Sequence, residues 1–266
     1  MSATAASAEE PSGRRGVSRR TLLVTGGGAL VVGALGAEAV TAAGRPAAPL
    51  PGTTPPDVDL MAEHGVLKRV LLIYEECVRR ISTGQPTPVA AVHAAAGVIH
   101  TFIEGFHEAL EEGYVFPPLQ KAGQLVELVD TLFVQHARGR ELTQLILGAS
   151  ASAGHASASG SAPGTGATET DTQAMTDAMT AFLRMYAPHE AREDTVVFPR
   201  FRALHSPEEL QALGNTFSAL SVSTFGPQGF AHVVDQVATI ERSLGIYDLS
   251  QFTPAPLGVT PAPAGE

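Results

Sequence analysis

The stretch HEALEEGYVFP at residues 107–117 recurs as HEAREDTVVFP at residues 189–199, a shift of 82 residues along the chain. In both copies a Glu follows the His by four residues, and Phe-Pro follows it by nine and ten. A His and a Glu spaced by four lie on one helix face, one turn apart, so that both can face one ion. The repeat therefore predicts a metal site inside a helical bundle, with ligands on two helices.

The longer pattern carries more information than the His-Glu spacing alone. That spacing also occurs, without Phe-Pro after it, at two other places: His100–Glu104 and His205–Glu209. The alternative interpretation of the repeat is a pair of amphipathic helices that end alike and bind no metal. We expect His205, and His232 further along, to have no role in a site.

Residues 1–45 are predicted to be a signal peptide and linker. Arg19 and Arg20 precede a Gly/Ala/Val/Leu run that continues to about Ala37, and small residues follow. This order is typical of a secretory signal, and the apolar run is short for a membrane span of about 20 residues. The paired arginines resemble a twin-arginine signal. We expect export to the periplasm or the cell exterior, with membrane contact only in transit; the alternative is an uncleaved N-terminal anchor.

The composition excludes some classes of partner and bond. A net charge of −10 argues against nucleic acid as a partner. Cys77 is the only cysteine, so the chain cannot form an internal disulfide, and we expect this thiol in the core.

Apolar residues recur at helical spacing over four main segments, at about 57–82, 88–119, 124–147 and 171–202. The segment 148–170 is rich in Ala, Ser, Gly and Thr, which predicts a flexible insertion. Four helices with two short turns and one long linker predict an all-α, up-down-up-down four-helix bundle over residues 57–202.

Beyond the bundle the chain is predicted to form additional helices and then a tail. Residues 203–245 contain two shorter helical segments, at about 207–220 and 228–244. The Pro/Ala-rich stretch 246–266 is expected to be disordered.

Counting along the chain places one histidine from each helix at the same height. In an up-and-down bundle, two residues equally far from a turn lie level with one another. The midpoint of His64 and His107 falls in the break at 83–86, and that of Glu111 and His136 falls at Gly123. The midpoint of His136 and His189 falls inside the 148–170 segment. Four imidazoles are therefore expected to meet.

Six residues are candidate metal ligands: His64, His107, Glu111, His136, His189 and Glu193. Nitrogen and oxygen donors without thiolate suit iron, manganese or zinc. Six protein ligands are too many for one open site, so they suit two metals that share carboxylates.

The order His, His-x-x-x-Glu, His, His-x-x-x-Glu, with Phe-Pro after each pair, resembles the hemerythrin-like HHE cation-binding family over about residues 57–202. The stretch from Gln135 to Leu142 also resembles the third-helix segment of that family. The resemblance implies a non-haem di-iron centre in a four-helix bundle. It also implies binding or sensing of dioxygen, and some members are linked to nitric oxide, peroxide or iron handling.

The chain departs from the oxygen-carrying members of this family at Arg140. Those members have a fifth histidine at this place, so one metal is expected to be less fully coordinated here. Water or His100 could take the open position. His100 could also be an outer partner that orients a ligand, together with Glu104 on the same face, or a residue at the bundle edge. Glu112 and Asp194 are expected to lie in solvent, because each follows a ligand carboxylate by one residue and is turned ~100° around the helix.

The leading functional hypothesis is an exported di-iron protein that binds dioxygen or a related small ligand at an open iron position. The alternative is an enzyme in which the same centre acts on peroxide, nitric oxide or ferrous iron. Ferritin-like di-iron oxidases use Glu-x-x-His, and the spacing found here differs from it.

Overall fold

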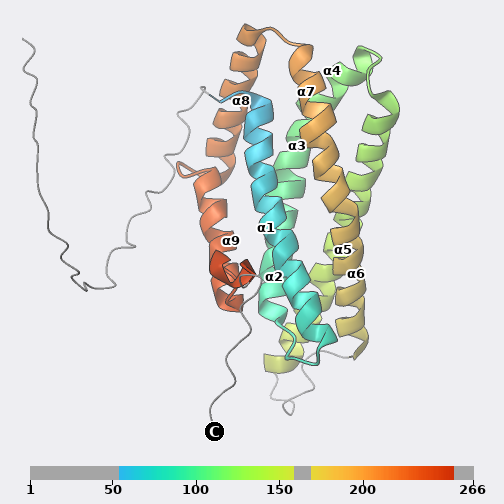
Figure 1. Cartoon of the computed structure of the whole chain (residues 1–266), viewed down its shortest axis with the longest axis vertical. Coiled ribbons are helices and arrows are strands. Elements are labelled where there is room, and N and C mark those ends of the chain that lie inside the picture. The colour runs from blue at the N-terminus through green and yellow to red at the C-terminus, as the bar shows by residue number, and fades with distance from the viewer. Residues whose placement is uncertain (1–53, 159–168, 255–266) are drawn as a thin grey trace, which may run out of the picture. The chain divides into compact units, whose positions relative to one another are not determined.

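Four helical rods run side by side in the computed structural model, which describes residues 54–158 and 169–254 (Figure 1). The first rod is α1 (Pro56–Ser82), the second runs from α2 (Val89–Val98) to α4 (Phe116–Lys121), the third is α5 (Val126–Ala158), and the fourth runs from α6 (Glu169–Arg192) to α7 (Phe198–Ala203). Each rod packs against the rods before and after it, and the fourth packs against the first. The predicted all-α four-helix bundle is confirmed. The predicted signal, residues 1–45, lies outside the described residues.

The first rod shows how the local sequence sets a helix boundary. Pro56 lies at the first helical position, where its missing N–H costs nothing, and Asp57 and Asp59 favour the positive end of the helix dipole. The helix ends where Gly84 adopts a left-handed conformation with φ 71°. The Gln85 N–H then donates to the Arg80 carbonyl at 2.9 Å, which closes the last turn.

The second and fourth rods change from α-helix to π-helix at corresponding places. In the second rod η1 (Ile99–His107), a π-helix, precedes the short α3 (Glu108–Leu110), and a second π-helix, η2 (Glu111–Val115), follows. In the fourth rod the π-helix η3 (Glu193–Val197) lies between α6 and α7. Both η2 and η3 begin at a glutamate of the repeat and end just before its Phe-Pro.

A Phe-Pro pair directly follows each of these two wide turns. In each copy the Phe N–H donates to the carbonyl of the glutamate five residues earlier: Phe116 to Glu111, and Phe198 to Glu193. The proline that follows has no N–H and would crowd the carbonyl four residues before it in an α-helix. The wider π-turn relieves this conflict, and such turns are frequent at functional sites. The sequence repeat is therefore a repeat of backbone structure.

The third rod is longer than predicted. Helix α5 continues to Ala158, so residues 148–158 of the expected flexible insertion are helical. Residues 159–168 lie outside the described part of the chain. At the C-terminus, residues 249–252 of the predicted disordered tail form the 3-10 helix η4 (Leu249–Phe252), and residues 255–266 are not described.

Two further helices cover the side of the bundle formed by α1 and α2, as predicted from the sequence. They are α8 (Pro207–Phe225), which starts with a capping box at Ser206, and α9 (Phe230–Leu244). Arg69 on α1 donates to both carboxylate oxygens of Glu241 on α9, at 2.9 and 2.5 Å.

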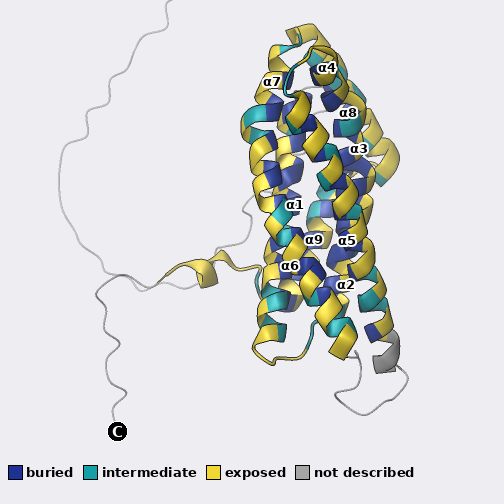
Figure 2. Ribbon diagram, turned by 90° about the vertical axis from the view of Figure 1, so that its right-hand side faces the viewer, coloured by how far each residue is buried: buried dark blue, intermediate teal, exposed yellow. Residues whose placement is uncertain are grey.

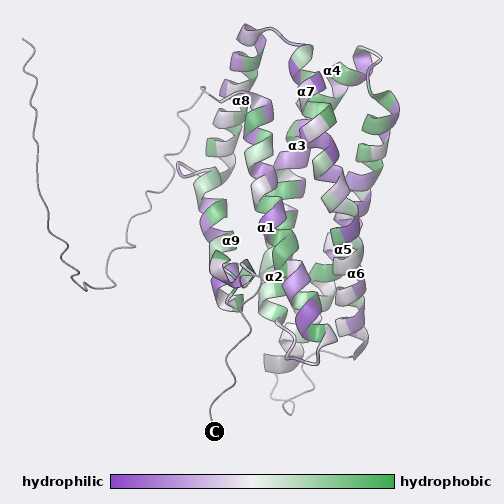
Figure 3. Cartoon of the chain, viewed as in Figure 1, coloured by the Kyte–Doolittle hydropathy of each residue, from purple (hydrophilic) through white to green (hydrophobic). Residues whose placement is uncertain are grey.

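Buried residues line the interior along the whole length of the bundle (Figure 2). Hydrophobic residues are concentrated along α2 (Figure 3). The run Val89–Lys121 is long and apolar enough to span a membrane by composition, but half of its most apolar window is buried inside the protein. We interpret it as a core helix, because it packs against α1, α5 and α9. Cys77 is buried, as expected.

Candidate metal centre

All six predicted ligands come together inside the bundle. They are contributed by all four rods and form two groups, His64–His107–Glu111 and His136–His189–Glu193. Within each group the possible ligand atoms lie within 4.8 Å of one another. All six side chains are buried, and both glutamates are fully buried. The structure thus places the six residues as predicted, and their role as ligands is taken up below.

The two glutamates connect the two groups. One oxygen of Glu111 lies 3.5 Å from His107 Nε2, and its other oxygen lies 3.5 Å from His136 Nε2. Glu193 Oε2 lies 3.4 Å from His64 Nε2 and 3.1 Å from His189 Nε2. Its other oxygen lies 4.0 Å from His136 Nε2. Each carboxylate therefore faces histidines of both groups, which is the arrangement needed to bridge two ions.

The polar atoms at this point lack partners from the described part of the protein. Among the described residues, none of the four oxygens of Glu111 and Glu193 has a hydrogen-bond partner, and neither do His64 Nε2 and His136 Nε2. Leaving a buried carboxylate unsatisfied costs about 1–3 kcal/mol or more. A pair of divalent cations would satisfy all of these atoms, so the residues fit the metal centre that the sequence predicts.

Each histidine is held at its other nitrogen by a residue from a neighbouring rod. The four Nδ1–H groups donate at 2.7–2.9 Å as follows: His107 to Glu63, His136 to Glu112, His189 to Gln135, and His64 to Asp194. Every acceptor lies on the preceding rod, and the fourth rod supplies the first, so the bonds form a closed ring around the bundle. Such outer partners fix the tautomer and keep Nε2 free to bind metal.

Sequence reasoning missed this ring of acceptors. The expectation that Glu112 and Asp194 lie in solvent is wrong, because their side chains are only 27% and 20% exposed and each binds a histidine. Glu63 and Gln135 were not singled out at all. One signal could have found them: each of the four acceptors is adjacent in sequence to one of the six candidate ligands.

The Phe-Pro phenylalanines also belong to the centre. Phe198 stacks on His64, with ring centroids 5.5 Å apart, and Phe116 stacks on His136 at 5.6 Å. Both phenylalanines are fully buried. The two copies of the repeat therefore do the same two things: each supplies a His-Glu pair and covers a histidine of another rod with an apolar ring that keeps water away.

Arg140 stands where oxygen-carrying hemerythrins have a fifth histidine, and it is not directed at the centre as a ligand. Its Nη2 contacts Glu112 Oε1 at 2.6 Å and Glu108 Oε2 at 2.9 Å. The guanidinium thus supplies the cation for the carboxylate group Glu108–Glu112, a third grouping with His136 that could otherwise hold a metal. Glu108 also accepts a hydrogen bond from the Tyr186 hydroxyl at 2.6 Å.

The other histidines lie apart from the centre. His100 is 53% exposed and donates to Glu104 at 3.1 Å, so neither residue supports the ligands as an outer partner. His205 Nδ1 donates to the Phe201 carbonyl, and His232 is exposed, as expected for histidines without a role in the site.

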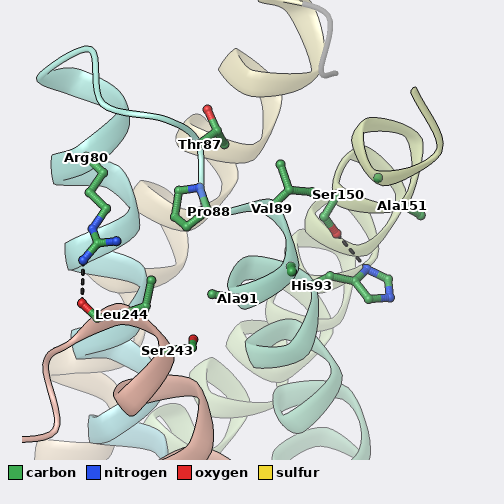
Figure 4. Close-up of a pocket in the computed structure, with 12 residues that line it drawn as sticks. Arg80, Thr87, Pro88, Val89, Ala91, His93, Ser150, Ala151, Ser243 and Leu244 are labelled. Atoms are coloured by element: carbon green, nitrogen blue, oxygen red, sulfur yellow. Dashed lines mark hydrogen bonds between the residues drawn. The ribbon is translucent and has the colours of Figure 1, made fainter. Parts of the chain in front are cut away.

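A pocket of about 810 Å³ lies beside the turn between α1 and α2 (Figure 4). Its walls include Arg80, which donates to the Leu244 carbonyl, and His93, whose Nδ1 lies 2.9 Å from Ser150 Oγ. None of the six candidate ligands lines this pocket. It is therefore a separate feature and not an opening of the centre.

Without metal, the centre has strongly shifted pKa values. Burial, and then the nearby Glu193 and Glu108, raise the pKa of Glu111 well above its usual value. Burial, together with the neighbouring His64, lowers the pKa of His107. For His64 burial acts to lower the pKa, but the hydrogen bond to Asp194 and the Glu193 carboxylate outweigh it and raise the pKa to about 9.

Metal affinity is expected to rise with pH up to about pH 9, because His64 must lose a proton before it can bind metal. Below its raised pKa the proton competes with the metal, so affinity should increase by at most about tenfold per pH unit from pH 7, and by less as the pH approaches 9. Competition with a chelator of known affinity at pH 7, 8 and 9 measures this. Asp194→Asn should flatten the dependence, and an affinity that does not change over this range would contradict the assignment.

The all-helical architecture is consistent with a hemerythrin-like bundle, and residues 56–159 match the hemerythrin HHE cation-binding domain family. The chain is 45% identical over 249 residues to uncharacterised proteins of Mycobacterium tuberculosis and Mycobacterium bovis, and the alignments cover 90% of this chain and 92% of each relative. The chain belongs to the same family as these proteins and carries the HHE domain. No solved structure matches it significantly.

Proposed function

We propose that the centre binds two non-haem iron ions and takes up dioxygen or a related small ligand at a position that the protein leaves open. The observation that carries this proposal is the placement of Glu111 and Glu193, each of which faces histidines of both groups. Two shared carboxylates and two histidines per group make a site for a pair of ions, not for one.

The donor atoms favour iron. Imidazole nitrogen with carboxylate oxygen, and no thiolate, suits iron, manganese or zinc, and membership of the HHE family favours iron among these. The six residues provide fewer donors than two octahedral ions accept, so positions remain for a small ligand.

The protein's own side chains protect and orient the centre. Bound iron would supply the redox chemistry, while the ring of acceptors holds the four imidazoles in place. Phe116 and Phe198 limit the access of water to His136 and His64. A small apolar ligand such as dioxygen can cross such packing more easily than a large or charged substrate can.

The second candidate is an enzyme that acts on peroxide, nitric oxide or ferrous iron at the same centre. Arg140 favours it, because a guanidinium is no metal ligand and here pairs with Glu108 and Glu112, so the side chain at this position does not complete the coordination of one metal. A more open metal allows a substrate to react as well as bind.

Adding dioxygen to the anaerobic, diferrous protein separates the two candidates. Reversible binding should give a stable charge-transfer absorption band that disappears under vacuum or argon. Rapid irreversible oxidation, or turnover of hydrogen peroxide, would favour the enzyme. If the diferrous protein reacted with neither dioxygen nor hydrogen peroxide, that result would contradict both candidate functions.

A further inference from the structure

His100 and Glu104 form a His-x-x-x-Glu pair that the centre does not use. The pair lies seven residues before His107 and Glu111. Its His Nδ1 to Glu Oε2 distance is 3.1 Å, comparable with the His-to-Glu distances of 3.5 and 3.1 Å inside the centre. The sequence spacing of the centre thus occurs again here, with the imidazole facing its glutamate through Nδ1 and not through Nε2 as in the centre.

The two members of this pair lie in different surroundings. His100 is 53% exposed, whereas the Glu104 side chain is only 4% exposed. Glu104 Oε2 accepts the hydrogen bond from His100, but its Oε1 has no partner among the described residues. A buried carboxylate oxygen without a partner calls for a cation or a water. The imidazole that binds the other oxygen is itself exposed to solvent.

A second carboxylate, Glu108, lies between this pair and the centre. Glu108 lies one turn beyond Glu104, close enough for the Glu104 charge to raise its pKa, although burial is the larger cause. Glu108 Oε2 in turn lies 4.0 Å from His136 Nδ1. Arg140 forms ion pairs with Glu108 and Glu112, and the ion pair of Glu104 is with His100. The charge of Glu104 also acts on Arg140 and helps to raise its pKa.

The second pair of this spacing outside the centre, His205–Glu209, shows what an ordinary His-Glu pair looks like. Glu209 belongs to the capping box of α8 and accepts the Ser206 N–H, and His205 binds a backbone carbonyl. Both groups have local backbone partners, and neither residue is buried. His100–Glu104 differs in one respect that matters for a metal site: Glu104 Oε1, an oxygen that can bind a cation, is buried and has no hydrogen-bond partner among the described residues.

We propose that His100 and Glu104 form an accessory divalent-cation site, at which cations are captured from solution before they pass to the centre. The site has two protein ligands, with water completing the coordination, so it binds more weakly than the centre. The inference rests on the proposed metal centre for its role in delivery, but the binding of a cation at the accessory site can be measured independently.

The test uses Co²⁺ as the probe, with metal-free protein and two variants. His100→Ala removes a half-exposed side chain that forms a hydrogen bond with Glu104, so this variant should fold. His232→Ala is the matched control, because His232 is also an exposed helix histidine, but it has the neutral Gln236 at the fourth position after it. Equilibrium dialysis with elemental analysis counts the bound cations, and visible absorption follows the rate of loading.

Wild type and His232→Ala should bind one cation more than His100→Ala at high Co²⁺ concentration. The tightly bound ions of the centre should be the same in all three proteins. Loading of the centre in His100→Ala should be slower by about tenfold, because the variant lacks the imidazole ligand that holds a cation near the centre and raises its local concentration. Equal stoichiometry or equal loading rates in the three proteins would overturn the accessory site. A chain that binds no cation tightly would instead contradict the proposed centre.

Discussion

The Glu193→Gln variant is expected to retain less than about one metal ion per chain, compared with about two in the wild type. Both oxygens of Glu193 face imidazole nitrogens, and they reach His64, His136 and His189. An amide has no negative charge, and its NH₂ group would point at a nitrogen or at the metal. The loss of one carboxylate therefore weakens the binding of both ions at once. Elemental analysis of the purified variant measures the effect.

Glu241→Gln is the matched control for this experiment. Glu241 is also a buried carboxylate, but it pairs with Arg69 between α1 and α9, away from the centre. This control should lose some stability and keep its full metal content. If Glu193→Gln also kept about two ions, the bridging role of Glu193 would be wrong.

The His107→Ala variant is expected to lose metal and to be destabilised by about 3–5 kcal/mol, because the change leaves buried charges without a partner. His107 is buried between Glu63, which accepts its Nδ1–H, and Glu111, which faces its Nε2. For a domain of this size such a loss lowers Tm by roughly 10 °C. Thermal unfolding followed by circular dichroism, with metal analysis of the same sample, measures both effects.

Comparison with metal-free wild type separates the stability lost with the metal from the stability lost with the His107 side chain itself. Metal that binds only the folded state stabilises it by about 2.7 kcal/mol at one hundred times its Kd, and metal-free wild type lacks only this part. His107→Ala should unfold below metal-free wild type, because Glu63 and Glu111 have also lost a partner. His232→Ala should match the wild type in Tm and in metal content. Equal Tm values for His107→Ala and the wild type would show that His107 is not a ligand.

The sequence predicted which six residues would lie together, because two kinds of regularity fix their positions. The repeat places His107 with Glu111 on one helix face, and the turn positions place His64 and His136 at the same height. Both depend only on helix geometry and on where the turns lie, and Gly84 and Gly123 both adopt left-handed conformations at those turns. The meeting of the six candidates could therefore be predicted without any knowledge of side-chain packing.

The ring of acceptors could not be predicted in the same way. A residue one position from a ligand is turned ~100° around the helix, which points it either to solvent or to the neighbouring rod. The choice depends on how each rod is rotated within the bundle, and the π-turns at Glu111 and Glu193 change that rotation locally. Asp194 and Glu112 therefore face histidines instead of water.

The end of α5 was missed for a different reason. Residues 148–158 read GASASAGHASA, and the prediction gave most weight to Gly and Ser, which favour loops. Alanine has the highest helix propensity of all residues, and it alternates with them here. A helix already formed over Val126–Leu147 needs no new nucleation to continue into such a segment.

Metal content tests the account most directly. The protein should be produced with iron available, purified without chelators, and analysed for iron, manganese and zinc against chain concentration. The account predicts about two iron ions per chain, one for each group of ligands. A single ion per chain, a predominance of another metal, or no metal would contradict the di-iron centre.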